Sequence, residues 1–345
     1  MTGAALPALP ARRATQVPAG PGGDVPRRLS PSRPASDVAF RGALRVAGCL
    51  VLALMGLIGV FLALRAGQAF SRYRWAFFTT TTWNEGGRLG IAAVLSGTVV
   101  IAAVAMVFAA PVAFGTALFV SEYAPARLQR GLVSVVDLMA AIPSVVYGLW
   151  GALFLQGHVA ALARFLSDHL GWVPLFRVHG VDHRAVPYNL IRYSSSSLLA
   201  GMVVAMMVIP IASSIMREAF SHAPIGEREA AYALGSTRWG MVRSVVLPYG
   251  RGGMIGGLML GLGRALGETI AVVLVISPEF VIKGRILELG ANSVAALIAS
   301  RYGEASSIGL SALMAAGLVL FVVTLGVNLV AAWVVAHSRS TVDTA

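Results

Sequence analysis

The chain has 345 residues, of which 57% are apolar and only 12% are charged, and its mean hydropathy is +0.77. This composition lies far from that of ordinary soluble domains and predicts an integral membrane protein. A formal net charge of +12 is also typical of nucleic-acid-binding chains. Here, however, the arginines are dispersed between apolar segments and form no basic face interleaved with aromatic residues. The single cysteine, Cys49, excludes a disulfide within the chain.

The N-terminal segment, residues 1–42, is rich in Pro, Ala, Gly and Arg and shows no hydrophobic periodicity. Such a segment buries too little apolar surface to offset the conformational entropy that is lost on folding. We therefore expect residues 1–42 to form a disordered cytoplasmic tail. A second, short tail is expected at residues 337–345.

Six apolar segments reach the roughly 20 residues that a helix needs to cross a bilayer. They predict an all-α membrane protein in which an even number of spans places both termini on the same side. Arg127 and Arg130 lie in the short connection after the second segment, which has no acidic residue, and they favour the cytoplasm for that side. The predicted spans are residues 43–64, 94–120, 132–155, 198–216, 253–276 and 311–335.

Prolines and serines add detail to these spans. Pro111, Pro143 and Pro210 fall within predicted spans. We expect bent helices there, because neighbouring helices can satisfy the carbonyls that lose their partners. Four consecutive serines, Ser194–Ser197, precede the fourth span and provide hydroxyls that can cap its first turn.

The connection between the fourth and fifth spans is too long for a tight turn. Residues 227–234 are helix formers with an acidic start, where the helix dipole favours a negative charge. Gly235 is expected to end this helix, and Ser236 or Thr237 to cap a second one that ends at Pro248. Composition leaves two interpretations of the first helix: it enters a groove on a partner protein, or it rests on lipid headgroups.

The spacing of residues in this connection, the loop of residues 217–250, favours the first interpretation. From residue 229 it reads E-A-A, three residues, G, nine residues, V, one residue, L-P. This pattern resembles the E-A-A-x3-G-x9-I-x-L-P loop of the permease subunits of bacterial ABC importers, with Val245 in place of isoleucine. The resemblance implies a coupling helix that docks into a cleft of an ATP-hydrolysing subunit. The residues to which it assigns this role are Glu229, Ala230, Ala231 and Gly235.

The fifth span carries two charges, Arg264 near its middle and Glu268 four residues later. An arginine at the centre of a span costs roughly 2.5 to 3.5 kcal/mol on insertion scales. Because Glu268 lies one helical turn away on the same face, we expect the two side chains to pair. A purely structural pair is one interpretation. In the other, Arg264 is a forked donor for an oxyanion such as phosphate or sulfate, and Glu268 holds the fork, accepts a proton or repels an ionised anion.

Glycines surround these charges at intervals of four residues. Gly252 with Gly256 forms one such row, and Gly253 with Gly257 and Gly261 forms another. Small residues at this spacing let a second helix approach closely.

Four further segments narrow the resemblance. They are G-R-A-L-G-E-T at residues 263–269, S-E-Y-A-P at 121–125, I-P-S-V-V-Y-G-L-W-G at 142–151 and N-S-V-A-A-L-I at 292–298. They are similar to segments of the PstC family of phosphate-transport permeases, and the similarity covers about residues 43–336. The companion PstA permeases have a similar loop and span, but the first and third segments favour PstC.

The resemblance implies a type I ABC importer permease with six transmembrane helices in the bacterial cytoplasmic membrane, with Arg264 and Glu268 on the phosphate path. Its implied partners are a PstA-like second permease, two copies of a PstB-like ATPase and an extracytoplasmic PstS-like phosphate-binding protein. The sequence contains no G-x-x-x-x-G-K-[ST] loop, so ATP and Mg are expected on the ATPase. We expect no catalytic residue, cofactor or metal site in this chain.

Other functions stay open. An importer for another oxyanion, such as sulfate or molybdate, would use the same elements. A passive anion channel could use Arg264 but would not need the E-A-A loop. A membrane-embedded enzyme acting on phospholipids would need a cluster of acidic, histidine or nucleophilic residues, whereas the acids of this chain are scattered.

Overall fold

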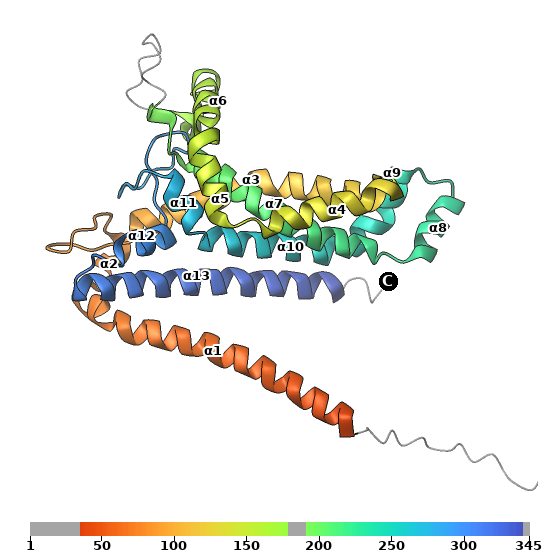
Figure 1. Cartoon of the computed structure of the whole chain (residues 1–345), viewed down its shortest axis with the longest axis horizontal. Coiled ribbons are helices and arrows are strands. Elements are labelled where there is room, and N and C mark those ends of the chain that lie inside the picture. Colours follow the sequence, from red (N-terminus) through yellow and green to blue (C-terminus); the bar gives the residue numbers. More distant parts are fainter. Residues whose placement is uncertain (1–34, 179–190, 341–345) are drawn as a thin grey trace, which may run out of the picture. The chain divides into compact units, whose positions relative to one another are not determined.

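The computed structural model describes residues 35–178 and 191–340. Within these ranges the regular structure is helical, with isolated β-bridges but no strand. Six helical segments are long and apolar enough to cross a membrane, which confirms the predicted all-α, six-span architecture (Figure 1). They are Asp37–Tyr73, Ala92–Tyr123, Ser144–Leu170, Ser197–Ser221, Arg238–Gly267 and Ser307–Val335.

The chain divides into two units, residues 1–55 and 56–345. In the first unit the described residues form the start of α1 (Ala35–Tyr73). Residues 35–42, which were predicted as part of a disordered tail, are therefore helical. Asp37 in the first turn of α1 pairs with Arg41 at 3.2 Å, and such an i,i+4 pair supports a helix that composition alone does not predict. The rest of the predicted tail, up to residue 34, lies outside the described residues.

The second unit begins with the remainder of α1 and ends with α13 (Ser307–Ser340), which continues into the predicted tail of residues 337–345. One hydroxyl ties these two helices together. Ser311 Oγ accepts a hydrogen bond from the amide of Ala69 at 3.0 Å and donates one to the carbonyl of Arg65 at 2.8 Å. The end of α1 is thereby fixed to the start of α13.

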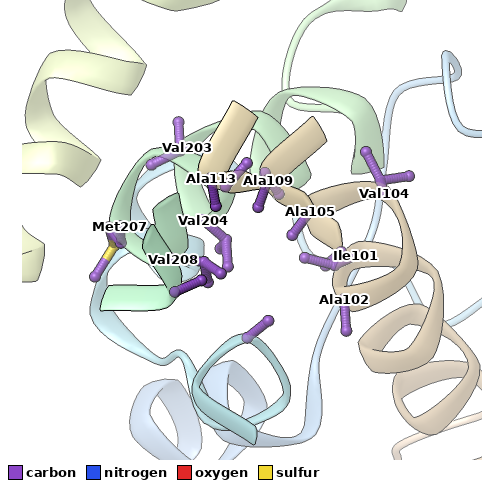
Figure 2. Packing of buried hydrophobic residues seen from close by; sticks show 14 of the residues in the cluster. Ile101, Ala102, Val104, Ala105, Ala109, Ala113, Val203, Val204, Met207 and Val208 are labelled. Carbon is purple, nitrogen blue, oxygen red and sulfur yellow. The ribbon is translucent and has the colours of Figure 1, made fainter. Parts of the chain in front are cut away.

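The largest core of this unit includes the contact of α3 (Ala92–Leu118) with α7 (Ser197–Ser221). Figure 2 shows the alanine-rich face of α3, including Ala109, beside Val204 and Val208 of α7. Small side chains on one helix and branched side chains on the other let the two backbones approach closely. α3 and α7 therefore pack together as one layer, and α10 packs against α7.

The row of glycines on α10 (Leu247–Gly267) makes the contact with α7. Gly253, Gly257 and Gly261 all face that helix, and a Cβ on Gly261 would lie 2.6 Å from a valine side chain of α7. The predicted close approach is confirmed for this row. Gly256, from the other predicted row, has open space where its Cβ would lie.

The third predicted span, residues 132–155, is wrong as a single bent helix. α4 (Ala126–Ala141) is followed by Ile142, which is extended with ψ 129°, and Pro143 precedes α5 (Ser144–Trp150). Proline provides no amide hydrogen and forces the residue before it out of the helical region, so the helix breaks instead of bending.

Correspondingly, the segment long enough to span begins after this break. α5 continues through a π-helical turn, η2 (Gly151–Leu155), into α6 (Gln156–Leu170). Arg127 and Arg130 lie in the first turns of α4 and not in a loop. The other two prolines, Pro111 and Pro210, lie inside continuous helices, α3 and α7.

The start of α7 also follows the sequence prediction. Ser196 is its N-cap, and its Oγ accepts a hydrogen bond from the amide of Leu199 at 3.4 Å. The other described helical elements are α2 (Ala76–Thr79), η1 (Phe119–Tyr123), η3 (Pro174–Phe176), α8 (Ile225–Ala233), α9 (Arg238–Met241), η5 (Val242–Val246), α11 (Ile270–Val275) and α12 (Val294–Arg301).

Candidate functional site

Arg264 lies near the end of α10, and its side chain is exposed in a cleft of about 700 Å³. Residues of α10, α13, α7 and the second half of α1 line this cleft, and most of them are apolar. Thr324 and Asn328, which lie four residues apart on α13, provide the other polar side chains. The rest of the lining consists of Leu62, Ile211, Leu260, Gly263, Gly267, Gly317, Leu320 and Phe321.

The polar groups of the cleft differ in what they already bind. Thr324 donates its hydroxyl to carbonyls of its own helix at 2.9 and 3.0 Å. Arg264 and Asn328, in contrast, have no hydrogen-bond or ion-pair partner in the described part of the chain. A Cβ on Gly263 would lie 3.5 Å from the Oδ1 of Asn328, so the two helices meet at this point. The cleft therefore presents a cationic donor and an amide, both with unused hydrogen-bonding capacity.

Glu268 does not pair with Arg264, and this part of the sequence prediction is wrong. α10 ends at Gly267, and Glu268 is extended with ψ 129°, which removes it from the face that carries Arg264. Its buried carboxylate turns instead to α11, where Oε1 accepts a hydrogen bond from the amide of Ala271 at 3.4 Å. The start of a helix favours a carboxylate because of its free amides and its dipole. The break between α10 and α11 thus separates the two charges.

α8 projects residues of the E-A-A motif from the end of the bundle at which α7 finishes (Figure 1). Glu229 and Ala230 are exposed, whereas Ala231 is the one residue of α8 that is buried. Gly235 follows with φ +79°, the left-handed conformation that ends many helices and that glycine adopts without strain. The predicted end of this helix is confirmed.

Large apolar side chains are exposed around α8. They include Ile225, Tyr232, Trp239 and Leu234, of which Leu234 is 88% exposed. A cluster of exposed apolar side chains is typical of a surface that a partner or a membrane covers. α8 therefore presents exposed apolar side chains together with exposed residues of the motif.

The second helix of this loop differs from the prediction. Thr237 caps it, because its Oγ1 accepts a hydrogen bond from the amide of Gly240 at 3.1 Å. Pro248 does not end it: α9, η5 and α10 form one uninterrupted helical segment, Arg238–Gly267. Pro248 falls in the first turn of α10, directly after the π-helical turn η5. A wider turn changes the hydrogen-bonding register and leaves room for a residue without an amide hydrogen.

One arrangement at this end was not predicted. Arg228 in α8 forms an ion pair with Glu122 in η1, with 2.9 Å between Nη1 and Oε2. The same guanidinium donates to the carbonyl of Phe220 at 2.6 Å and to that of Ala223 at 3.2 Å. Ser121 Oγ donates to the other carboxylate oxygen of Glu122 at 2.8 Å. Both segments were noted as motifs, but 106 positions separate the paired residues, so no local pattern connects them.

Residues 109–340 match the family described as "Binding-protein-dependent transport system inner membrane component". The chain belongs to this family. The match begins within α3 and includes α8 with its ion pair to η1 and the cleft residues other than Leu62.

Named relatives agree with this family. The chain is 41% identical over 300 residues to "Phosphate transport system permease protein PstC" of Xylella fastidiosa, which covers 86% of this chain and 89% of the relative. It is 38% identical over 294 residues to "Phosphate transport system permease protein PstC 2" of Mycobacterium tuberculosis, with 84% and 88% covered. These relatives are permease subunits, as the motifs predicted.

A solved structure shows the same fold. The chain resembles the crystal structure of a bacterial ABC transporter involved in the import of the acidic polysaccharide alginate, with a TM-score of 0.56 and 19% identity. The likeness covers 86% of this chain and 96% of that chain. At this level of identity the likeness concerns the fold alone, and it confirms the predicted permease architecture.

Proposed function

We propose that this chain is the transmembrane permease subunit of an ATP-driven phosphate importer and forms half of its translocation pathway. Its relatives carry the name of phosphate transport permeases. The structural observation that supports the substrate class most directly is Arg264, a permanently charged fork in a cleft between membrane-spanning helices, without a partner in the described ranges. Oxyanions fill such a planar fork with paired, charge-assisted hydrogen bonds.

Glu268 has a different role in this proposal from that of an ion-pair partner. Because its carboxylate caps α11, it holds the break that ends α10 just beyond Arg264. Arg264 lies at the end of a helix beside the cleft. In this proposal Glu268 lies at the edge of the phosphate path. The anion then meets the guanidinium without displacing an internal carboxylate.

The second half of the proposal concerns energy coupling. Glu229, Ala230, Ala231 and Gly235 form the part of α8 that we infer docks into a separate ATPase subunit, which binds ATP and Mg and carries out hydrolysis. Support comes from the exposed apolar side chains around α8, a feature that a passive channel does not need. We expect ATP-driven closure of the ATPase pair to move α8 and to switch the spans between inward-open and outward-open states.

The proposed assembly follows from these two sites. A PstA-like permease completes the pathway, two PstB-like ATPases bind the coupling loops, and a PstS-like protein delivers phosphate from outside. Because ATP is cytoplasmic, α8 and both chain termini face the cytoplasm.

Uptake by the reconstituted complex tests the function. Proteoliposomes containing the chain with its partner permease and ATPases are supplied with binding protein, ATP and radiolabelled phosphate. We expect ATP-dependent uptake that excess sulfate or molybdate does not suppress. Uptake that prefers sulfate or molybdate would replace phosphate by another oxyanion, and phosphate flux without ATP would identify a passive channel.

A further inference from the structure

The guanidinium of Arg228 connects three elements, α8, η1 and the end of α7. It belongs to α8, forms an ion pair with Glu122 of η1 at 2.9 Å, and donates hydrogen bonds to the carbonyls of Phe220 and Ala223 at 2.6 and 3.2 Å. Phe220 lies in the last turn of α7, and its carbonyl also accepts a hydrogen bond from the amide of Ala223 at 3.2 Å. One side chain therefore joins α8 both to the end of α7 and to the π-helical extension of α3.

The ion pair is secluded from water. Glu122 is only 4% exposed, and its second oxygen is occupied by the hydroxyl of Ser121 at 2.8 Å. The Arg228 side chain is 20% exposed. Breaking such a pair leaves a buried charge without compensation, which costs far more than breaking a pair at the surface. The ion pair therefore resists separation of α8 from η1.

α8 has few other attachments. Ala231 is its one buried residue, and its flanks are the short turns at Pro224 and Gly235. A second contact to the same extension comes from α9, where the guanidinium of Arg238 lies over the ring of Tyr123 at 5.1 Å from its centroid. Both helices of the loop thus hold η1, and the buried connection is the one made by Arg228.

We infer that the Arg228–Glu122 pair transmits the movement of α8 to α3 and α7. This inference rests on the proposed function, because it takes α8 as the element that the ATPase moves. The covalent route from the loop runs through α9 and η5 into α10 and ends near Arg264. The pair adds a second route, into the α3–α7 layer whose packing forms much of the core. Arg228 and Glu122 are positioning residues, since neither lies at the cleft.

Three substitutions test this role in the reconstituted complex: Glu122→Gln, Arg228→Gln and the two together. The quantity measured is the number of phosphate ions taken up per ATP hydrolysed, with radiolabelled phosphate and released inorganic phosphate followed in parallel. We expect each single variant to lower this ratio by about tenfold, within the range of typical coupling free energies between sites. The double variant should fall no further, because both changes remove one interaction.

Two further variants complete the design. Arg251→Gln is the matched control, since Arg251 is an exposed arginine of α10 that has no hydrogen bond or ion pair to other described residues, and it should keep the wild-type ratio. Arg228→Lys keeps the charge but loses the fork, so it should lie between wild type and Arg228→Gln.

The outcomes separate this inference from the proposed function. If the wild-type complex imports phosphate but all pair variants keep its ratio of phosphate to ATP, the inference is overturned and the function stands. Loss of the ATPase subunits from the purified variant complexes would also overturn it, because the pair would then serve assembly and not transmission. Additive effects of the two single substitutions would show that the residues act separately.

Discussion

Two arginines of this chain stand in opposite situations. Each of the three guanidinium nitrogens of Arg228 donates one hydrogen bond within the chain, to Glu122 and to the carbonyls of Phe220 and Ala223. Arg264 uses none of its donors on the described residues and faces an open cleft. The contrast shows how an arginine in a membrane protein can be assigned. A guanidinium whose three nitrogens all donate within the chain holds elements together, whereas one with no such bond has its full capacity left for a ligand.

The largest effect on phosphate uptake is expected from substitution of Arg264. Replacing Arg264 by Gln removes the permanent charge and the fork, and we expect phosphate uptake to fall by about 100-fold or more, since hydrogen bonds to charged groups contribute about 1.5–3 kcal/mol each. Uptake of radiolabelled phosphate by proteoliposomes measures it. The complex should still assemble and hydrolyse ATP, because Arg264 makes no hydrogen bond or ion pair to the described residues. Normal uptake by this variant would show that Arg264 is not on the path.

At the end of α8, substitution of Gly235 is expected to have a smaller effect, on binding of the ATPase subunits. With φ +79° it suits glycine, and a β-branched residue there costs on the order of 1–3 kcal/mol of backbone strain. We expect Gly235→Val to weaken binding of the ATPase subunits by about tenfold, because the strain displaces the end of α8. Co-purification at graded ATPase concentrations measures this binding.

Gly235→Asn is the matched control for that variant. Asparagine tolerates the left-handed conformation far better than valine, so its binding should stay close to that of the wild type. Equal losses for both variants would indicate that bulk at residue 235, and not its backbone conformation, is what matters.

Substitution of Asn328 tests whether a second polar group of the cleft binds phosphate. Its amide is the second polar group there without a partner among the described residues, so Asn328→Ala should raise the phosphate concentration for half-maximal uptake by about fivefold, the value of one neutral hydrogen bond. Thr324→Val is the control in the same wall, because the Thr324 hydroxyl is already bonded to its own helix. A larger effect of the Thr324 variant would contradict this assignment.

The smallest expected effect lies outside the spans. The Glu85 carboxylate accepts a hydrogen bond from the amide of Ser306 at 3.0 Å, and hydrogen bonding to Ser306 lowers the pKa of Glu85 below its ordinary value. A lowered pKa in the folded state stabilises the protein above the ordinary carboxyl range, and this contribution is lost as the pH falls through the lowered pKa. At pH 7, Glu85→Gln should reduce Tm by about 1–2 °C.

Thermal unfolding of both proteins across a pH series tests this assignment. The difference in Tm between wild type and variant should shrink toward zero as the medium becomes acidic enough to protonate Glu85. A difference that stays constant with pH would show that the charge of Glu85 is not the cause.

Local patterns predicted much of this molecule because they act over one or two helical turns. The six apolar segments, the Ser196 cap and the glycine row from Gly253 to Gly261 all follow from spacing along one helix. The cap at Thr237 and the turn at Gly235 belong to the same class.

The errors have another cause. An i,i+4 pair of Arg264 and Glu268 requires an unbroken helix, but the chain breaks where α11 begins and packs against α5: a Cβ on Gly148 would lie 2.9 Å from the Cα of Ala271. That packing joins segments far apart in the sequence, so it overrides the local preference. The Arg228–Glu122 pair was missed for the same reason, since only the fold brings the two residues together.

The π-helical turn η5 has a consequence for the direction in which Arg264 faces. An α-helix rotates by about 100° per residue, and a π-helical turn accommodates one residue more than an α-helical turn. Everything beyond η5 is therefore rotated about the helix axis relative to α9. In the continuous helical segment Arg238–Gly267, this extra residue rotates the residues of α10 about the helix axis. The rotation contributes to the direction in which Arg264 faces the cleft. Shortening η5 by one residue would rotate the guanidinium toward a neighbouring face, together with the other cleft residues of α10.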